Sequence, residues 1–303
     1  MLTFDQLIPE NGFVIAEPAC AHEGDYQRLV QLIDCAAEAG ASIIKFQIFT
    51  TEERALKRHR EWEIFSRLEI KENVWTKAIQ HAHKRKLTVF ADVFGEESLS
   101  IAQRLGVDGY KIHSEDLLNS YFVSKVASLD KILLISVGGA HRVELFNLLN
   151  FLKSKDQLKK TILMVGVQTF PTSINAHCLS EITDLIEKYS SFGVKIGFAD
   201  HISGDQEESI IIPFMALSRG ACVIEKHYTI NREDKWIDYH SSLNKEDFKK
   251  FISYIRNLSP LLKPFGPVHP SEKEYRKMFK KTVVSARDIS KDQPIDIEDI
   301  VFK

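Results

Sequence analysis

Residues 194–227 read VKIGFADHISGDQEESIIIPFMALSRGACVIEKH and contain the structural unit that repeats along the chain. A short run rich in β-branched and aromatic residues, 194–200, is followed by a longer segment and then by a second such run, 221–227. A strand, a helix and another strand in this order predict a βαβ unit of a parallel sheet. Both runs end in charged and imidazole side chains, in the triplets ADH and EKH, which is uncommon for buried strands.

The same alternation begins at residue 13. Eight runs have the composition of buried strands: 13–17, 42–47, 87–92, 109–113, 132–137, 161–168, 194–200 and 221–227. Between them apolar residues recur every three or four positions, for example at 26–39 and 73–86, as in amphipathic helices. Eight such units predict a closed (β/α)8 TIM barrel. A doubly wound open sheet would also alternate, but its first strand is normally followed by a Gly-rich turn, where this chain reads PACAHEG.

The barrel domain is expected to span residues 1–260 and to end with a helix at 248–258. The Pro-rich stretch that follows, PLLKPFGPVHPSEKEY, reads as a linker. The last residues, TVVSARDISKDQPIDIEDIVFK, predict a strand, a turn and a second short strand, which are too few to bury a core. We therefore expect residues 261–303 to form a linker followed either by the truncated start of a second domain or by a short tail that packs on the barrel or on another subunit.

The composition is that of an ordinary soluble globular protein. Its 40 Lys and Arg nearly balance its 42 Asp and Glu, so the charge favours neither nucleic acid nor an anionic membrane as a partner. No apolar run approaches the ~20 residues of a membrane-spanning helix. The four cysteines are scattered, without a Cys-x-x-Cys pair or a secretory segment, which predicts reduced thiols and a cytoplasmic location.

The predicted strands end in polar side chains, and strand ends carry the catalytic groups of TIM barrels. The residues at these ends are Glu17, Lys45, Gln47, Asp92, Lys111, His113, Ser114, Ser136, Gln168, Asp200, His201, Glu225, Lys226 and His227. Buried charges are costly unless they are paired or bind a ligand. For any single residue, a hydrogen-bonded polar layer that plugs the barrel is an equally good explanation. Because seven of the eight strands end in charged or amide groups, we favour an active site.

His201 and His227 follow the last two predicted strands, which are neighbours in a barrel. Two imidazoles at one spot, with water or substrate oxygens as further ligands, suit a divalent transition metal that acts as a Lewis acid. A hydrogen-bonded core histidine is the better explanation for either residue alone, whereas the adjacent pair favours a metal site.

Lys45 and Lys111 end the second and fourth strands and could hold one anion between two ammonium groups. The Gln47 amide and the Ser114 hydroxyl would add hydrogen bonds. This arrangement can bind a phosphate or a carboxylate without a Gly-rich loop. The alternative is that the lysines form ion pairs with Glu17 or Asp92.

Seven stretches together resemble the sialic acid (N-acetylneuraminate) synthase family, which includes the legionaminate, pseudaminate and spore-coat polysaccharide synthases. They are IAEPACAHEGD, IIKFQIFTTE, YKIHSED, GVQTFPTS, IGFADHISG, VIEKHYT and DYHSS. The resemblance runs in the family's order and spacing from about residue 13 to the tail. It implies a (β/α)8 barrel followed by the start of a small antifreeze-like domain, and a homodimer in which that domain reaches the partner's active site.

The resemblance also implies a reaction. Phosphoenolpyruvate would condense with an open-chain 2-acetamido sugar, such as N-acetylmannosamine, to give a nonulosonic acid and phosphate. The implied metal is manganese, with magnesium or cobalt as alternatives, and its ligands are His201 and His227. The residues implied in catalysis are Glu17, Lys45, Asp116 and Glu225. Those implied in substrate binding are Lys45, Gln47, Asp92, Lys111, Ser114, Gln168, Phe170, Asp200, Asp238 and His22.

Several positions depart from the family's pattern. Asp92 stands where the family has a small hydroxyl residue, and a carboxylate beside a phosphate is repulsive. Gln168 stands for Asn, Phe170 for Tyr, Ala21 for Asn, and Asp116 for Glu. These departures leave two alternatives open: a non-catalytic or altered-ligand barrel of the same family, and another synthase that uses phosphoenolpyruvate in aldol chemistry.

Overall fold

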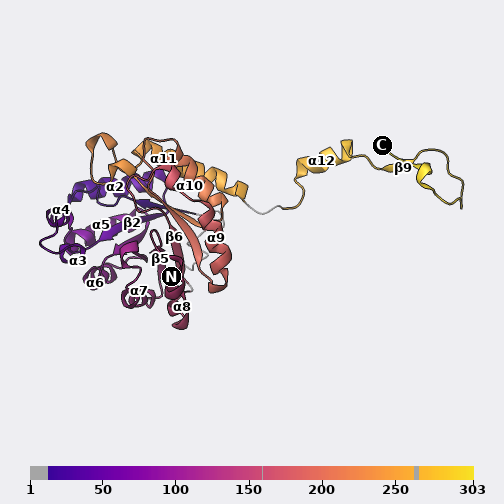
Figure 1. The fold of residues 1–303 in the computed structure, drawn as a ribbon. Helices are drawn as coiled ribbons and strands as arrows, with labels where there is room; N and C mark the ends of the chain where they lie inside the picture. The colour runs from indigo at the N-terminus through magenta and orange to yellow at the C-terminus, as the bar shows by residue number, and fades with distance from the viewer. Residues whose placement is uncertain (1–12, 159, 263–265) are drawn as a thin grey trace. The chain divides into compact units, whose positions relative to one another are not determined.

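The computed structural model describes residues 13–158, 160–262 and 266–303, and the chain divides into two compact units, Met1–Leu262 and Lys263–Lys303. In the first unit each strand pairs in parallel with the next, and β8 closes the ring onto β1 (Figure 1). The strands are β1 (Phe13–Glu17), β2 (Ile43–Ile48), β3 (Thr88–Val93), β4 (Gly109–Ile112), β5 (Ile132–Ser136), β6 (Thr161–Val165), β7 (Lys195–Asp200) and β8 (Val223–His227). The predicted TIM barrel is confirmed.

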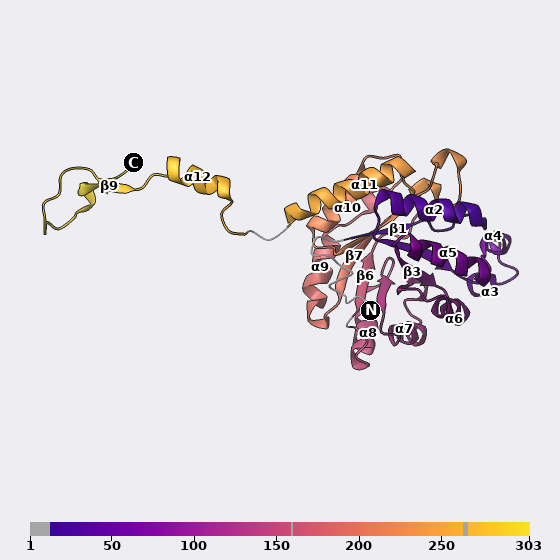
Figure 2. The same ribbon diagram turned by 180° about the vertical axis from the view of Figure 1, so that it is seen from behind.

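Helices connect successive strands around the outside of the barrel, and α2 lies between α5 and α11 (Figure 2). The helices are α2 (Tyr26–Ala39), α3 (Thr51–Arg54), α4 (Trp62–Leu68), α5 (Glu72–Lys84), α6 (Glu96–Arg104), α7 (Ser120–Ala127), α8 (Arg142–Ser154), α9 (Ser180–Tyr189), α10 (Glu208–Ser218) and α11 (Lys245–Leu258). The helix predicted at 26–39 matches α2. The short helices α3 and α4, between β2 and α5, were not predicted.

Helix α2 shows how local sequence sets these elements. The Asp25 side chain accepts a hydrogen bond from the Arg28 backbone N–H at 2.8 Å and caps the first turn. Gly40 ends the helix in the left-handed region, with φ of 86°, where a side chain would be strained. Between these caps one face is buried against the barrel, through Leu29, Leu32, Ile33, Cys35 and Ala36.

The barrel has an inner and an outer core, and successive residues of a strand face them alternately. The inner core consists of Ile15, Ile43, Phe90, Ile132, Leu134, Ile162, Met164, Ala199 and Val223. The outer core lies between the strands and the helices and is much larger. Two residues beyond Ile15, Ile43, Phe90 and Val223 stand Glu17, Lys45, Asp92 and Glu225, so the same alternation directs these charged side chains inward at the carboxyl ends of the strands.

The second unit contains helix α12 (Pro270–Phe279) and an antiparallel pair of strands, β9 (Val283–Ser285) and β10 (Ile300–Phe302). The interpretation of residues 260–275 as linker is therefore wrong from Pro270 onward. Pro270 at the first helical position and the reciprocal bonds between His269 and Glu272 begin this helix. The predicted strand, turn and strand of the tail are present. Residues 266–303 bury no apolar side chain.

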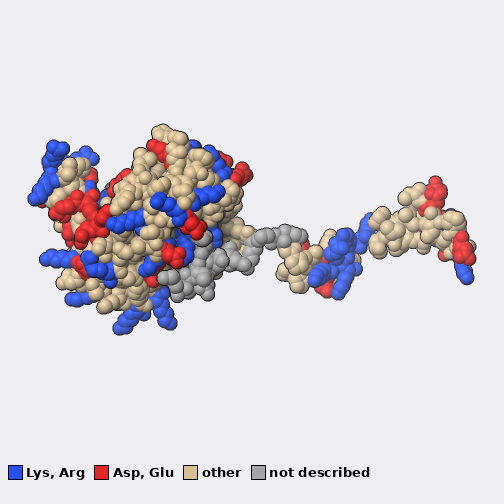
Figure 3. Space-filling view, turned by 90° about the horizontal axis from the view of Figure 1, so that it is seen from below, with Lys and Arg blue, Asp and Glu red and all other residues tan. Residues whose placement is uncertain are grey.

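The surface of the barrel unit carries both signs of charge. On the face shown in Figure 3, Lys and Arg are interspersed with Asp and Glu, in keeping with a formal net charge of −2. None of the helices in the described ranges is long and apolar enough to cross a bilayer.

Candidate active site

Five buried charged side chains from β1, β2, β3, β4 and β8 meet at the carboxyl end of the barrel: Glu17, Lys45, Asp92, Lys111 and Glu225. We call these five residues the charge cluster. Lys45 Nζ forms ion pairs with Glu17 and, at 2.5 Å, with Asp92 Oδ2, and lies 3.8 Å from Glu225 Oε2. Lys111 Nζ lies 2.6 Å from Glu225 Oε1 and 3.8 Å from Asp92 Oδ2. None of the five is more than 4% exposed.

The charge cluster contains more carboxylates than ammonium groups. Burial raises the pKa of Glu17 to about 7, although Lys45 opposes the shift. Burial would also raise the pKa of Asp92, but Lys45 and Lys111 outweigh it and hold that pKa at about 2. The cluster therefore carries one net negative charge when Glu17 is ionised and none when Glu17 is protonated. Neither lysine is a free cation, so the ion-pair alternative for Lys45 and Lys111 describes this structure.

His201 and His227 lie beside the charge cluster with ring centroids 5.3 Å apart. His201 Nδ1 is 2.9 Å from the Val167 carbonyl oxygen, which leaves Nε2 for another partner. His227 Nδ1 is buried and has no hydrogen-bond partner among the described residues. Burial lowers the pKa of His201 to about 4 and the pKa of His227 well below its usual range, so both rings are neutral at pH 7. Neutral imidazoles with open nitrogens have the chemistry of metal ligands.

The sequence profile of the NeuB family matches residues 32–264 of this chain. The chain belongs to the NeuB family. Its sequence is 28% identical over 295 residues to an uncharacterized protein of Methanocaldococcus jannaschii, covering 97% of this chain and 85% of that protein. It is 27% identical over 294 residues to the N,N'-diacetyllegionaminic acid synthase of Campylobacter jejuni, covering 92% and 86% of the two chains.

Among solved structures, the fold is similar to the N-acetylneuraminic acid (sialic acid) synthetase of Leptospira borgpetersenii in complex with citrate. The TM-score is 0.80 at 29% identity, over 89% of this chain and 92% of that chain. The named relatives are synthases. The NeuB-family resemblance is therefore confirmed, and the chain is an enzyme of the transferase class that forms carbon–carbon bonds.

Three more predicted residues of the NeuB-family chain lie at or after the carboxyl ends of β2 and β6: Gln47, Gln168 and Phe170. The Cys20 thiol donates to Gln47 Oε1 at 3.5 Å, and Gln168 Nε2 donates to Ser136 Oγ at 3.1 Å. Gln168 Oε1 is buried without a partner in the described part of the chain. The Phe170 ring lies 4.4 Å from the His201 ring.

Two predicted residues follow the strands on other loops. Asp238 accepts a hydrogen bond from the Cys20 backbone N–H, and burial raises its pKa. It lies within electrostatic range of Lys45, so the structure brings it close to the charge cluster. Ser114 begins a single 3₁₀ turn, Ser114–Asp116, directly after β4.

Three further predicted site residues contact groups outside the charge cluster. Asp200 and His201 are adjacent in sequence and cannot face the same side of a strand; Asp200 points to the outer face, where it forms a fully buried ion pair with Lys226. His22 is fully buried with its ring against Trp75 of the outer core, and its Nδ1 accepts from the Gly24 N–H at 3.0 Å. Burial lowers the pKa of His22 to about 4, and its buried Nε2 has no hydrogen-bond partner among the described residues, so its predicted role in substrate binding stays a prediction.

Asp116 is the third of these residues. Its carboxyl is half-buried and associated with Asn119, and burial raises its pKa. The charges that act on it are those of Arg54 and Glu53, which follow β2, and no lysine of the charge cluster is among them. The substitution of Asp for Glu shortens the side chain by one methylene. The structure therefore keeps Asp116 outside the cluster.

Sequence reasoning missed Arg54, the last residue of α3. Its guanidinium lies over the Phe94 ring at 4.0 Å and the Phe65 ring at 4.9 Å, and Nη1 pairs with Glu115. For the second strand, only side chains up to Gln47 were considered, and Arg54 lies seven residues further along the chain. Considering the loop after β2 as well would have found this cation, because TIM-barrel sites also use these loops.

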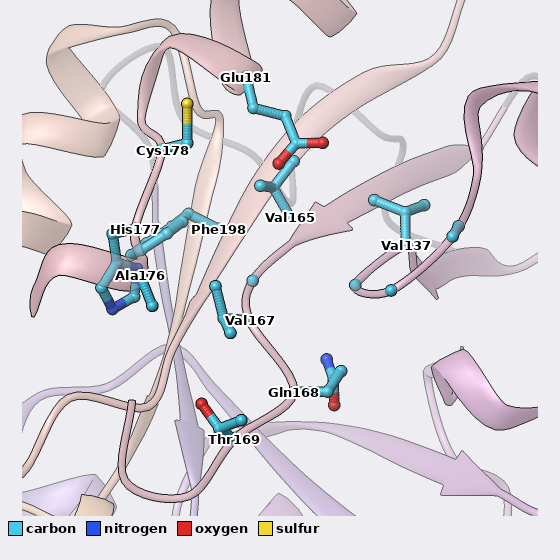
Figure 4. Close-up of a pocket in the computed structure, with 14 residues that line it drawn as sticks. Val137, Val165, Val167, Gln168, Thr169, Ala176, His177, Cys178, Glu181 and Phe198 are labelled. Atoms are coloured by element: carbon cyan, nitrogen blue, oxygen red, sulfur yellow. The ribbon is translucent and has the colours of Figure 1, made fainter. Parts of the chain in front are cut away.

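A separate cavity of about 330 Å³ lies beside the barrel between the loops that follow β5 and β6 (Figure 4). Val137, Val165 and Phe198 form apolar walls, and Gln168 and Glu181 contribute polar groups. Gln168 therefore borders this cavity and also bonds Ser136.

Proposed function

We propose that this NeuB-family chain condenses phosphoenolpyruvate with the open-chain form of a 2-acetamido sugar like N-acetylmannosamine, giving a nonulosonic acid and phosphate. The observation that carries the proposal is the charge cluster beside two neutral histidines at the carboxyl end of a NeuB-family barrel. Such a site offers lysine N–H donors that can exchange a carboxylate partner for a substrate anion, and carboxyl groups for proton transfer.

Glu17 is the proposed acid–base group of the charge cluster. A carboxyl with a pKa of about 7, raised by burial, is present in both protonation states near neutral pH. It can therefore donate a proton to the sugar oxygen that develops negative charge, or accept one from the attacking water. Lys45 forms an ion pair with Glu17 and would also contact the anionic substrate.

His201 and His227 are the proposed ligands of a divalent metal, which we take to be manganese. The open Nε2 of His201 and the unpartnered Nδ1 of His227 fit that role. Within the described residues no three or more His, Cys, Asp or Glu side chains form a metal-binding group, so the remaining ligands would be water or substrate oxygens. A bound metal would polarise the sugar carbonyl.

We also propose a homodimer. Because residues 266–303 bury no apolar side chain, the second unit cannot be stable by itself and needs another surface. Sedimentation equilibrium of the full chain tests this proposal. A monomer at all concentrations would contradict it.

The reaction is tested by incubating the purified full-length protein with manganese, phosphoenolpyruvate and a panel of 2-acetamido sugars. We expect phosphate release that depends on both substrates, with a nine-carbon keto acid detected by mass spectrometry. Lys45→Met should abolish product formation, and Glu72→Gln, on the outer helix α5, should not change it. Absence of product with every sugar would contradict the proposed function.

The Asp92 ion pair favours one alternative function, a barrel that binds a less charged ligand. Asp92 lies between the two lysines, 2.5 Å from Lys45 and 3.8 Å from Lys111, and takes the place that a substrate anion would occupy. Binding of pyruvate in preference to phosphoenolpyruvate would support this alternative.

A further inference from the structure

The proposed function raises a problem of charge balance, and the inference that follows rests on that function. Phosphoenolpyruvate carries about three negative charges at pH 7, from one carboxylate and one phosphate ester. The two buried lysines are already compensated by three carboxylates. A substrate with this much negative charge is therefore compensated only in part by the proposed divalent metal, and a further cation on the chain at the barrel mouth would strengthen its binding.

Arg54 is placed to be that cation. It lies in the loop after β2 and pairs with Glu115 in the loop after β4, so the pair spans the ends of the strands that carry Lys45 and Lys111. Its charge acts on Cys20 and His113, which follow β1 and β4. The Arg54 side chain is 17% exposed, so it is partly shielded from water yet open to a ligand.

Two aromatic rings hold the guanidinium in place. Stacking on Phe94 at 4.0 Å and Phe65 at 4.9 Å restricts the orientation of the Arg54 side chain before any ligand binds. Phe94 and Phe65 both contact Phe49, at centroid distances of 6.1 and 5.9 Å, so the rings form one cluster. A fixed guanidinium loses less conformational entropy when it binds an anion.

The Arg54 guanidinium is only partly used. Nη1 pairs with Glu115, while Nε and Nη2 have no hydrogen-bond partner among residues 13–158, 160–262 and 266–303. Glu115 is 49% exposed, and its other near contact is His113 Nδ1 at 3.7 Å. A carboxylate that is this exposed and has so few partners can leave the guanidinium at low cost.

In a second Arg–Glu pair of the chain, Glu72 binds the Arg104 guanidinium more completely than Glu115 binds that of Arg54. Arg104 binds Glu72 through two parallel hydrogen bonds of 2.8 and 2.9 Å, so its fork is satisfied by a carboxylate of the chain itself. That pair joins α6 to α5 on the outside of the barrel. The Arg54 pair has one such contact, lies at the barrel mouth and is held by aromatic rings.

We propose that Arg54 determines specificity by binding the phosphate or carboxylate group of the anionic substrate, and that Glu115 occupies this position in the free protein. The guanidinium fork matches either group in a bidentate contact. Substrate binding releases Glu115 to solvent and gives the substrate a side-chain cation that is not already compensated by buried carboxylates.

The test is isothermal titration calorimetry of the full-length protein with phosphoenolpyruvate, inorganic phosphate and pyruvate at fixed low salt. Glu115→Gln removes the competing carboxylate and should strengthen anion binding several-fold. Arg54→Leu should weaken it about tenfold, and in Arg54→Leu the further change Glu115→Gln should bring no gain. Glu72→Gln, the matched control, should leave affinity unchanged. Comparing the three ligands shows whether Arg54 binds phosphate or carboxylate.

Melting temperatures of all variants separate a binding effect from unfolding of α3, and Glu115→Gln keeps Arg54 and its aromatic contacts intact. Equal or weaker anion binding by Glu115→Gln would overturn the inference. So would absence of anion binding in both wild type and Glu115→Gln. If anion binding follows Arg54 and Glu115 but no sugar gives product, the inference stands and the proposed reaction fails.

Discussion

The chain buries lysine and carboxylate together in two places that differ in stoichiometry and position. Lys226 and Asp200 form a one-to-one pair on the outer face of β7 and β8, where both side chains are fully buried. The charge cluster sets two lysines against three carboxylates on the inner face, at the barrel mouth. We call Lys226 and Asp200 the closed pair. Its one positive and one negative charge balance, so it needs no further charged group. The cluster has unequal numbers of positive and negative groups and lies at the carboxyl ends of the strands, where the active sites of TIM barrels lie.

The largest expected effect comes from a substitution that breaks the closed pair. Lys226→Met leaves the buried Asp200 carboxylate without its cation, with only the Ile202 backbone N–H as a hydrogen-bond partner among the residues that the structure describes, and should cost about 3 to 5 kcal/mol in the free energy of unfolding. The double variant Lys226→Met, Asp200→Asn removes the uncompensated charge and should recover most of this loss. Urea denaturation measures both. A loss below about 1 kcal/mol in Lys226→Met would mean that water reaches Asp200 and that the pair is not closed.

How far the sequence predicts these two regions depends on periodicity. The barrel was predictable because strands and helices each impose a repeat, and the inward position of Lys45 and Glu225 follows from the same alternation. That alternation could also have separated Asp200 from His201, but the strand-end argument treated neighbouring residues as equivalent. Arg54 ends the one-turn helix α3 and His22 lies in a turn, and both segments are too short for a period to indicate direction. Their partners, Glu115 and Trp75, come from distant parts of the chain.

Removing a lysine from the cluster should affect ligand binding more than folding. Lys111→Ala takes one cation away and leaves Glu225 with Lys45 at 3.8 Å as its nearest compensation. Phosphoenolpyruvate binding should weaken by about 2 to 4 kcal/mol, which corresponds to tens to hundreds of fold. Calorimetry measures the affinity, and urea denaturation of the same variant measures its free energy of unfolding. Unchanged affinity would assign Lys111 to a structural ion pair like that of Lys226.

The pH dependence of stability should distinguish the cluster from the closed pair. Burial raises the pKa of Glu17 from 4.5 to about 7, so the native state binds this proton more tightly than the unfolded state. This contribution is complete below about pH 4.5 and is lost as the pH rises through about 7, a decrease of up to about 3 kcal/mol. Glu17→Gln should flatten the dependence of the unfolding free energy between pH 5 and 8. If the unfolding free energy of Glu17→Gln changes with pH as steeply as that of wild type, another titrating group is responsible for the change.

The smallest expected effect is the change in affinity caused by Asp92→Thr, which we compare with the same Asp→Thr substitution in the closed pair. In the cluster, Asp92→Thr removes a carboxylate and leaves two lysines with two carboxylates, so the charges balance. Lys45 and Lys111 lose a competitor at 2.5 and 3.8 Å, and phosphoenolpyruvate binding should strengthen by about 1 kcal/mol, or several-fold. In the closed pair, Asp200→Thr leaves Lys226 buried alone and should destabilise the fold.

Calorimetry and urea denaturation of both Asp→Thr variants therefore test the whole comparison. The expected pattern is a gain in affinity with little change in stability for Asp92→Thr, and a loss of stability for Asp200→Thr. Because both side chains are buried and both contact a lysine, burial and pairing alone predict the same result for the two variants. The difference in charge balance and in position on the barrel predicts different results: a gain in affinity for Asp92→Thr and a loss of stability for Asp200→Thr. Destabilisation by Asp92→Thr without a gain in affinity would mean that Asp92, like Asp200, serves the fold.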